Sequence, residues 1–86
     1  MLTPTPTFAD ILSFVLDKVA QRTKTPRETL TADTLLANVG VDSLSAVLIC
    51  GHCEDRFDLE LEPSVMFQCK TAHEVAEVIL KMLTKS

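Results

Sequence analysis

The chain has 86 residues, of which 47% are hydrophobic, and a formal net charge of −4. This length allows one small domain over residues 1–86, and the negative charge argues against nucleic acid as a partner while permitting docking onto basic protein surfaces. No apolar run approaches the roughly 18 residues that span a membrane, no signal peptide is recognisable, and three cysteines provide no disulfide framework. These features predict a cytoplasmic monomer.

A first helix is predicted over about residues 8–22. Two prolines in residues 1–6 disfavour helix there, and Thr7 and Asp10 then have the spacing of a capping box, with Asp10 in place of the usual Glu. The apolar residues that follow have the spacing of an amphipathic helix: Phe8, Ile11, Leu12, Val15, Leu16 and Val19. Phe14 lies off this stripe, either exposed or packed against the following loop.

The connection over residues 23–41 is unusually long for a compact domain, and such loops are often functional. Its apolar residues are numerous enough to hold it against the core; they are Leu30, Leu35, Leu36 and Val39. A brief helical turn is predicted at 32–36.

Residues 40–44 (Gly-Val-Asp-Ser-Leu) mark the start of a second helix, predicted over 43–57. Gly40 permits a sharp turn, and Asp42 is a residue type that caps helices. An anion attached to Ser43 would lie at the positive end of the helix dipole. Taken alone, the Asp-Ser pair is ordinarily just a helix cap.

The second helix has two apolar faces when each residue is given 100° of rotation. One face contains Ala46, Ile49, Cys50, Cys53 and Phe57, and the other contains Leu44, Val47, Leu48, Gly51 and Asp55. The first face is predicted to be buried, because Ile49 and Phe57 are its large anchors. Leu44, Val47 and Leu48 would then form an exposed stripe of the kind that binds partners; burial of both faces is the alternative.

The remaining chain predicts two further helices. An extended link over 58–63 leads to a short helix over 63–68 that begins with Pro63. Thr71 and Glu74 form a second capping box, which begins a last helix over 72–84. The predicted fold class is therefore all-α, with three longer helices, one short helix and a long first loop.

Residues 40–44, followed by a helix that ends in Glu-Asp-Arg-Phe at 54–57, resemble the attachment site of the acyl carrier protein family, and the order of helices agrees. The resemblance implies a four-helix carrier-protein bundle that is not an enzyme. Ser43 would be loaded with 4′-phosphopantetheine from coenzyme A by a phosphopantetheinyl transferase, with Asp42 assisting metal or transferase contact. The arm would hold acyl groups as thioesters.

The same resemblance implies roles for other residues. Leu44, Val47 and Leu48 would guide docking to a ketosynthase, acyltransferase or ligase-type enzyme, with Gly51 permitting close approach. Val65, Met66 and Phe67 of the short helix would border a cleft that shelters the acyl chain, although such residues are more often plain core.

Only the charge of the second helix indicates the biosynthetic pathway. Carriers of fatty acid synthesis tend to have acidic residues along the second helix, where this chain has Ser45 and Leu48. Docking should depend more on apolar contact, which favours polyketide or mixed polyketide–peptide synthesis. A carrier of fatty acid synthesis and a peptidyl carrier remain the alternatives.

Three other functions are weighed against that of a carrier: redox catalysis, zinc binding and an unmodified interaction module. Residues 50–53 spell Cys-Gly-His-Cys, the active site of protein disulfide isomerase, but they lack the preceding strand and helix N-terminus which that chemistry needs. Cys50, Cys53, Cys69 and His73 have spacings compatible with structural zinc, yet cysteine is also a common core residue. An unmodified helical interaction module is the third. We predict no metal site.

Overall fold

The computed structural model describes residues 6–84, and within that range the only strand-like feature is an isolated bridge between Leu35 and Thr71. The all-α prediction with four helices is therefore confirmed. The predicted tail lies almost wholly outside the described residues. In chain order the elements are α1 (Phe8–Thr23), the 3₁₀ turns η1 (Arg27–Thr29) and η2 (Leu36–Val39), α2 (Ser43–Phe57), α3 (Pro63–Gln68) and α4 (Ala72–Thr84).

Both predicted capping boxes are present. The Thr7 hydroxyl accepts from the Asp10 N–H at 3.1 Å, and the Asp10 carboxylate accepts from the Thr7 N–H at 3.2 Å. At the start of α4, Thr71 and Glu74 exchange equivalent bonds of 3.3 Å. These bonds satisfy N–H groups that have no partner inside the helix, so each helix begins where the sequence predicts.

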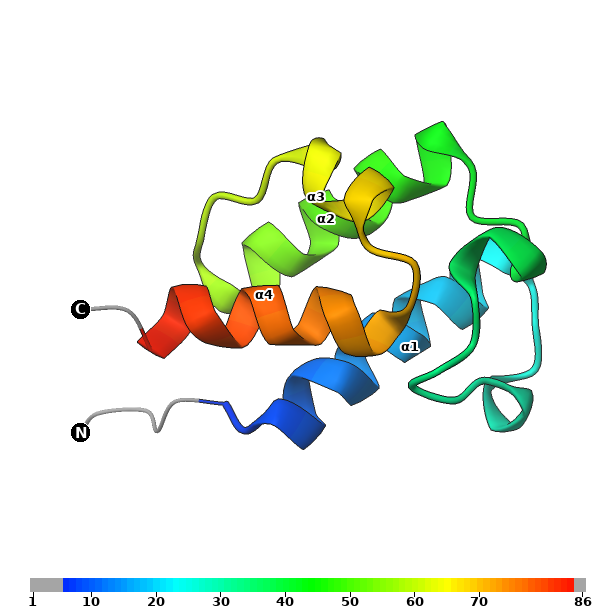
Figure 1. The fold of residues 1–86 in the computed structure, drawn as a ribbon, viewed down its shortest axis with the longest axis horizontal. Coiled ribbons are helices and arrows are strands. Elements are labelled where there is room, and N and C mark those ends of the chain that lie inside the picture. The colour runs from blue at the N-terminus through cyan, green and yellow to red at the C-terminus, as the bar shows by residue number, and fades with distance from the viewer. Residues whose placement is uncertain (1–5, 85–86) are drawn as a thin grey trace.

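The core lies between α1, α2 and α4. Figure 1 shows α1 and α4 running antiparallel, so that the start of α1 and the end of α4 lie at the same end of the molecule. The largest fully buried side chains are mainly aliphatic and include Ile11, Val15, Val19, Ile49, Val75 and Ile79. Within residues 6–84, no helix is long and apolar enough to cross a bilayer.

The face of α2 that contains Ile49 and Phe57 is buried, as predicted. Phe14 was expected to be exposed or packed against the long loop, and neither expectation is correct. Its ring meets that of Phe57 edge-on, with centroids 5.3 Å apart. An aromatic pair thus joins the middle of α1 to the end of α2.

The long loop is ordered differently from the prediction. Of the helical turn expected at 32–36, the structure has only a single turn at 32–33, closed by the Thr34 N–H donating to the Thr31 carbonyl at 3.1 Å; the 3₁₀ turns η1 and η2 lie before and after it. The Leu36 N–H instead donates to the Lys70 carbonyl at 2.9 Å, which ties the loop to the α3–α4 connection. Leu36 is buried, but Leu35 is 46% exposed and does not hold the loop to the core. Successive side chains of an extended segment point in opposite directions, which explains the difference.

Candidate functional site

The predicted site begins at Gly40, which ends η2. Its φ of +96° lies in the left-handed region, where a side chain would be strained. The Gly40 N–H donates to the Ala37 carbonyl at 3.3 Å, and the next N–H, from Val41, donates to the Leu36 carbonyl at 3.1 Å. These bonds close the end of the loop and direct the chain into α2.

Asp42 is the N-cap of α2. Its Oδ1 accepts from the Ser45 N–H at 2.8 Å, and its carbonyl accepts from the Ala46 N–H at 2.8 Å. The bond from Ser45 holds the pKa of the Asp42 carboxyl below its usual value, so this group is ionised at neutral pH. The capping role expected of Asp42 is confirmed.

Ser43 is the first residue of α2, and its side chain is exposed. Ser45, two residues further on, has the opposite environment: it is buried, and its hydroxyl accepts from Arg22 Nε at 3.1 Å. Only the first of the two serines therefore presents an accessible hydroxyl at the start of the helix. An exposed hydroxyl at the positive end of α2 fits a bulky anionic substituent.

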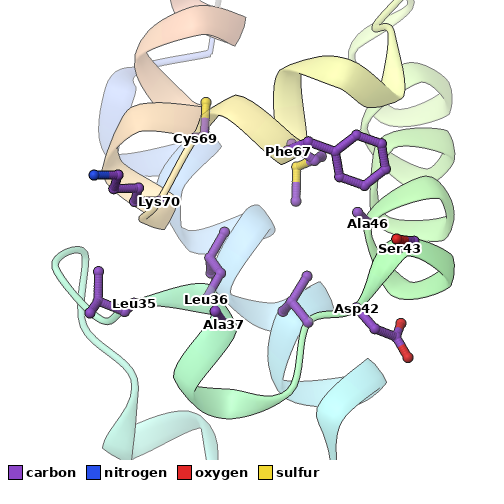
Figure 2. Close-up of a pocket in the computed structure, with 11 residues that line it drawn as sticks. Leu35, Leu36, Ala37, Asp42, Ser43, Ala46, Phe67, Cys69 and Lys70 are labelled. Atoms are coloured by element: carbon purple, nitrogen blue, oxygen red, sulfur yellow. The ribbon is translucent and has the colours of Figure 1, made fainter.

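A cleft of about 560 Å³ lies beside Ser43 (Figure 2). Its walls come from the long loop, the first turns of α2, α3 and the α3–α4 connection. Most of its lining is apolar, and the residues that surround it are Leu35, Leu36, Ala37, Val41, Asp42, Ser43, Ala46, Met66, Phe67, Cys69 and Lys70. Ser43 and an apolar cleft are thus adjacent.

Of the predicted wall, Met66 and Phe67 line this cleft but Val65 does not. Val65 is half-buried and packs against the core, because consecutive residues of the short α3 point in different directions. Leu36 and Lys70 also line the cleft, which the sequence did not predict. These two residues lie far apart in sequence and meet only through the hydrogen bond between loop and connection.

The predicted stripe on α2 is exposed. Leu44 is 60% exposed, Val47 45% and Leu48 40%, although each is a large apolar side chain. Gly51 lies further along the helix, and a Cβ built there meets no atom within 4 Å. Three exposed apolar residues therefore extend from the turn that carries Ser43.

The cysteines do not form a redox or metal centre in residues 6–84. Cys50 and Cys53 lie buried in the middle of α2, and burial raises their pKa to about 11 and about 12, which opposes the thiolate needed for disulfide exchange. No group of three or more His, Cys, Asp and Glu side chains in this range is placed to hold a metal ion. His73 Nδ1 instead lies 3.2 Å from Glu77 Oε1, and the centroids of the His73 and Phe8 rings are 5.0 Å apart.

Comparison with solved structures supports the fold assignment. A free-standing peptidyl carrier protein from an uncharacterized Acinetobacter baumannii secondary metabolic pathway superposes with a TM-score of 0.84, is 28% identical, and is matched over 90% of this chain and 96% of its own. The HMG-ACPI domain from the CurA module of Lyngbya majuscula has a TM-score of 0.83 over 98% of this chain and 88% of its own. At 18% identity the second likeness shows the fold alone.

Sequence comparison identifies the family. Polyketide synthase 2 of Metarhizium guizhouense is 33% identical over 76 residues, which is 88% of this chain, and that of Metarhizium acridum is 40% identical over 48 residues, which is 56% of it. The chain spans about 3% of the length of each. Residues 13–79 match the family described as the phosphopantetheine attachment site. The chain therefore belongs to this family of non-catalytic carrier domains, whose cofactor is phosphopantetheine.

Proposed function

We propose that Ser43 is the residue that carries 4′-phosphopantetheine, and that the chain is an acyl carrier. The observation that supports this most is the contrast between Ser43, exposed at the first position of α2, and Ser45, which is buried against Arg22. Ser43 also borders the apolar cleft. A transferase could reach the Ser43 hydroxyl without disturbing the core.

In this proposal the Ser43 Oγ attacks the pantetheine-bearing phosphate of coenzyme A in the active site of a phosphopantetheinyl transferase. The new P–O bond replaces the P–O–P bond of the pyrophosphate, adenosine 3′,5′-bisphosphate leaves, and the hydroxyl proton passes to a base of the transferase. The transferase supplies the base and the Mg²⁺, so no group of this chain needs to activate the hydroxyl. The ionised Asp42, fixed by its bond to Ser45, is placed to assist metal or transferase contact. When bound, the arm supplies a terminal thiol that holds acyl groups as thioesters.

The exposed residues Leu44, Val47 and Leu48 are proposed to guide docking to partner enzymes, with Gly51 permitting close approach. Their exposure on one side of a helix beside Ser43 supports this role, because exposed apolar side chains that cluster together commonly mark partner sites. A partner that covers the stripe would lie next to the attachment point. The tethered cargo would then reach its active site at high effective concentration.

Met66 and Phe67 are proposed to shelter the acyl chain in the cleft beside Ser43. Met66 is buried, whereas Phe67 is 57% exposed, so that the first forms the floor and the second forms the rim. The Leu36 N–H and the Lys70 carbonyl form the hydrogen bond that joins the two walls. Burial of an alkyl chain against these surfaces is favourable by about 0.8 kcal/mol per CH₂ group.

Polyketide synthesis is the pathway that we favour, because the polyketide synthase of Metarhizium guizhouense is 33% identical over 88% of this chain. In those pathways the partners would include a ketosynthase and an acyltransferase. A peptidyl carrier is the second candidate, favoured by the 28% identical peptidyl carrier protein. Loading from acyl coenzyme A would support the acyl carrier, and loading by an aminoacyl-activating ligase would support the peptidyl carrier.

Intact mass spectrometry tests the central proposal. The protein is incubated with coenzyme A, Mg²⁺ and a broad-specificity transferase, with Ser43→Ala and the matched control Ser64→Ala, another exposed serine. We expect one phosphopantetheinyl group on the wild type and on Ser64→Ala, and none on Ser43→Ala. A gain of mass by Ser43→Ala would overturn the assignment.

A further inference from the structure

A second hollow, of about 260 Å³, lies between the C-terminal half of α1 and the exposed side of α2. We call it the basic hollow. Lys18, Arg22 and Lys24 line it from α1 and its cap, and Leu48 and His52 line it from α2. No Asp or Glu side chain lines it. Three of the eight basic residues of a chain with net charge −4 therefore meet at one place.

The three cations are not used in ion pairs within residues 6–84. The nearest carboxylate in sequence to Lys18, that of Asp17, instead binds Arg27 at 2.8 Å. Lys18 Nζ lies 5.2 Å from the centre of the Phe14 ring, a cation–π contact. Arg22 donates to the neutral hydroxyl of Ser45. These contacts orient Lys18 and Arg22 without pairing either with a carboxylate in this part of the chain, although, besides the hydrogen bond from Ser45, the charge of Arg22 also helps to lower the pKa of the Asp42 carboxyl.

Helix polarity explains only part of this arrangement. Arg22 and Lys24 lie at the end of α1, where cations complement the negative end of the helix dipole. Lys18 lies more than one turn before that end, beyond the range of the effect. The dipole also gives no reason for a hollow that is shared with Leu48 and His52 of another helix.

The basic hollow is continuous with the exposed stripe on α2. Leu48 belongs to both, and Leu44, Leu48 and His52 follow one another at intervals of four residues, which places them on one side of the helix. A protein segment seated on the stripe would therefore extend over the cations. A free phosphate could use the charge but would gain nothing from the apolar side chains.

We propose that the basic hollow receives Asp or Glu side chains of a partner enzyme whose apolar residues cover Leu44 and Leu48. This proposal rests on the proposed function, and specifies the chemistry of the partner: a docking segment that is both apolar and acidic. The apolar contact supplies affinity, and the charges supply orientation and rate of association. The acidic net charge of the chain as a whole would predict the opposite polarity.

The test is an NMR titration of the ¹⁵N-labelled full chain with an amphipathic helical peptide that has leucines on one face and glutamates beside them. The matched peptide has glutamine at each glutamate position. We expect the glutamate peptide to shift the amides of residues 18–24 and 44–52 saturably, and the glutamine peptide to bind at least about tenfold more weakly. Added salt should reduce this difference, because exposed charges are screened.

Charge reversal on the carrier is the second part of the experiment. Lys18→Glu combined with Lys24→Glu should weaken binding of the glutamate peptide about tenfold or more, whereas Lys81→Glu, an exposed lysine of α4, should leave it unchanged. Equal weakening by Lys81→Glu would show a non-specific charge effect and overturn the proposal.

Three other outcomes would also overturn it. They are equal binding of both peptides, binding of neither, and saturation of the hollow by inorganic phosphate that displaces the glutamate peptide at comparable concentration. The last outcome would mark a site for a small anion. The intact mass of the wild type after transferase treatment reports the proposed function separately, because it requires no peptide binding.

Discussion

Both faces of α2 contain large apolar side chains, but their environments are opposite. Ile49 is 1% exposed, while its neighbour Leu48 is 40% exposed; likewise Ser45 is buried and Ser43 is exposed. One face packs against α1 and α3, whereas the described residues leave the other face exposed. The comparison shows that apolar character alone does not identify the core of this domain. Position relative to both α1 and α3 decides which residues of α2 stabilise the fold and which remain exposed.

The difference matters because one helix contributes both to the stability of the fold and to the proposed docking surface. The buried face fixes α2 against α1, and the N-cap Asp42 fixes the first turn. The exposed face can then be altered with little effect on folding. Substitutions on opposite faces should therefore separate stability from docking.

The largest expected effect is that of Ile49→Ala. Removal of a fully buried branched side chain leaves a cavity and should lower the free energy of unfolding by about 2–5 kcal/mol. Leu44→Ala, on the exposed face, should change it by no more than about 0.5 kcal/mol. Urea denaturation of both variants measures these values. Similar losses for the two would contradict the assignment of the faces.

The second largest effect that we expect is a loss of stability at alkaline pH, caused by the buried thiol of Cys53. The folded chain holds the pKa of Cys53 at about 12, above the ordinary value of 9.0, because burial disfavours the thiolate. Above pH 9 the unfolded chain therefore binds fewer protons than the folded chain, and the stability falls as the pH rises towards 12. Cys53→Ala should have a shallower decline than the wild type in denaturation curves taken across this range. An unchanged slope would contradict burial of the thiol.

Gly51→Ala should raise the free energy of unfolding, by less than Ile49→Ala lowers it. Glycine inside a helix is unfavourable relative to alanine, and an added Cβ meets no atom within 4 Å, so we expect stabilisation by about 0.5–1 kcal/mol. If partners approach α2 closely at Gly51, the same variant should be modified more slowly by the transferase at low carrier concentration. A stabilised variant with an unchanged rate would remove Gly51 from the docking surface.

The smallest expected change in stability is that of Leu48→Glu, within about 0.5 kcal/mol in thermal unfolding. Its docking should nevertheless weaken, because a carboxylate replaces an apolar contact on the stripe. The rate of phosphopantetheinyl transfer at low carrier concentration measures this effect, with Lys81→Glu as the control for added negative charge. A large loss of stability would show that Leu48 belongs to the core.

Local patterns predicted most of the fold. The capping pairs at Thr7 and Thr71 located the starts of α1 and α4, and Pro63 located the start of α3. The periodicity of α2 separated its two faces, and the size of Ile49 and Phe57 indicated which one is buried. These features depend on interactions between residues within one or two helical turns of each other.

Features that depend on contacts distant in sequence could not be predicted in this way. The exposure of Leu35 and the cleft wall formed by Lys70 both follow from the bridge between the long loop and the α3–α4 connection. The basic hollow likewise requires α1 and α2 to lie side by side, because Lys18 and His52 are far apart in the chain. No periodic pattern in a single element carries that information.

Tandem mass spectrometry of the modified wild-type protein tests the central claim most directly. Fragmentation of the peptide that contains α2 distinguishes Ser43 from Ser45, two serines that differ in exposure but are only two positions apart. The account predicts that the phosphopantetheinyl group is found on Ser43 alone. Its presence on Ser45, or on a residue outside the start of α2, would contradict the account.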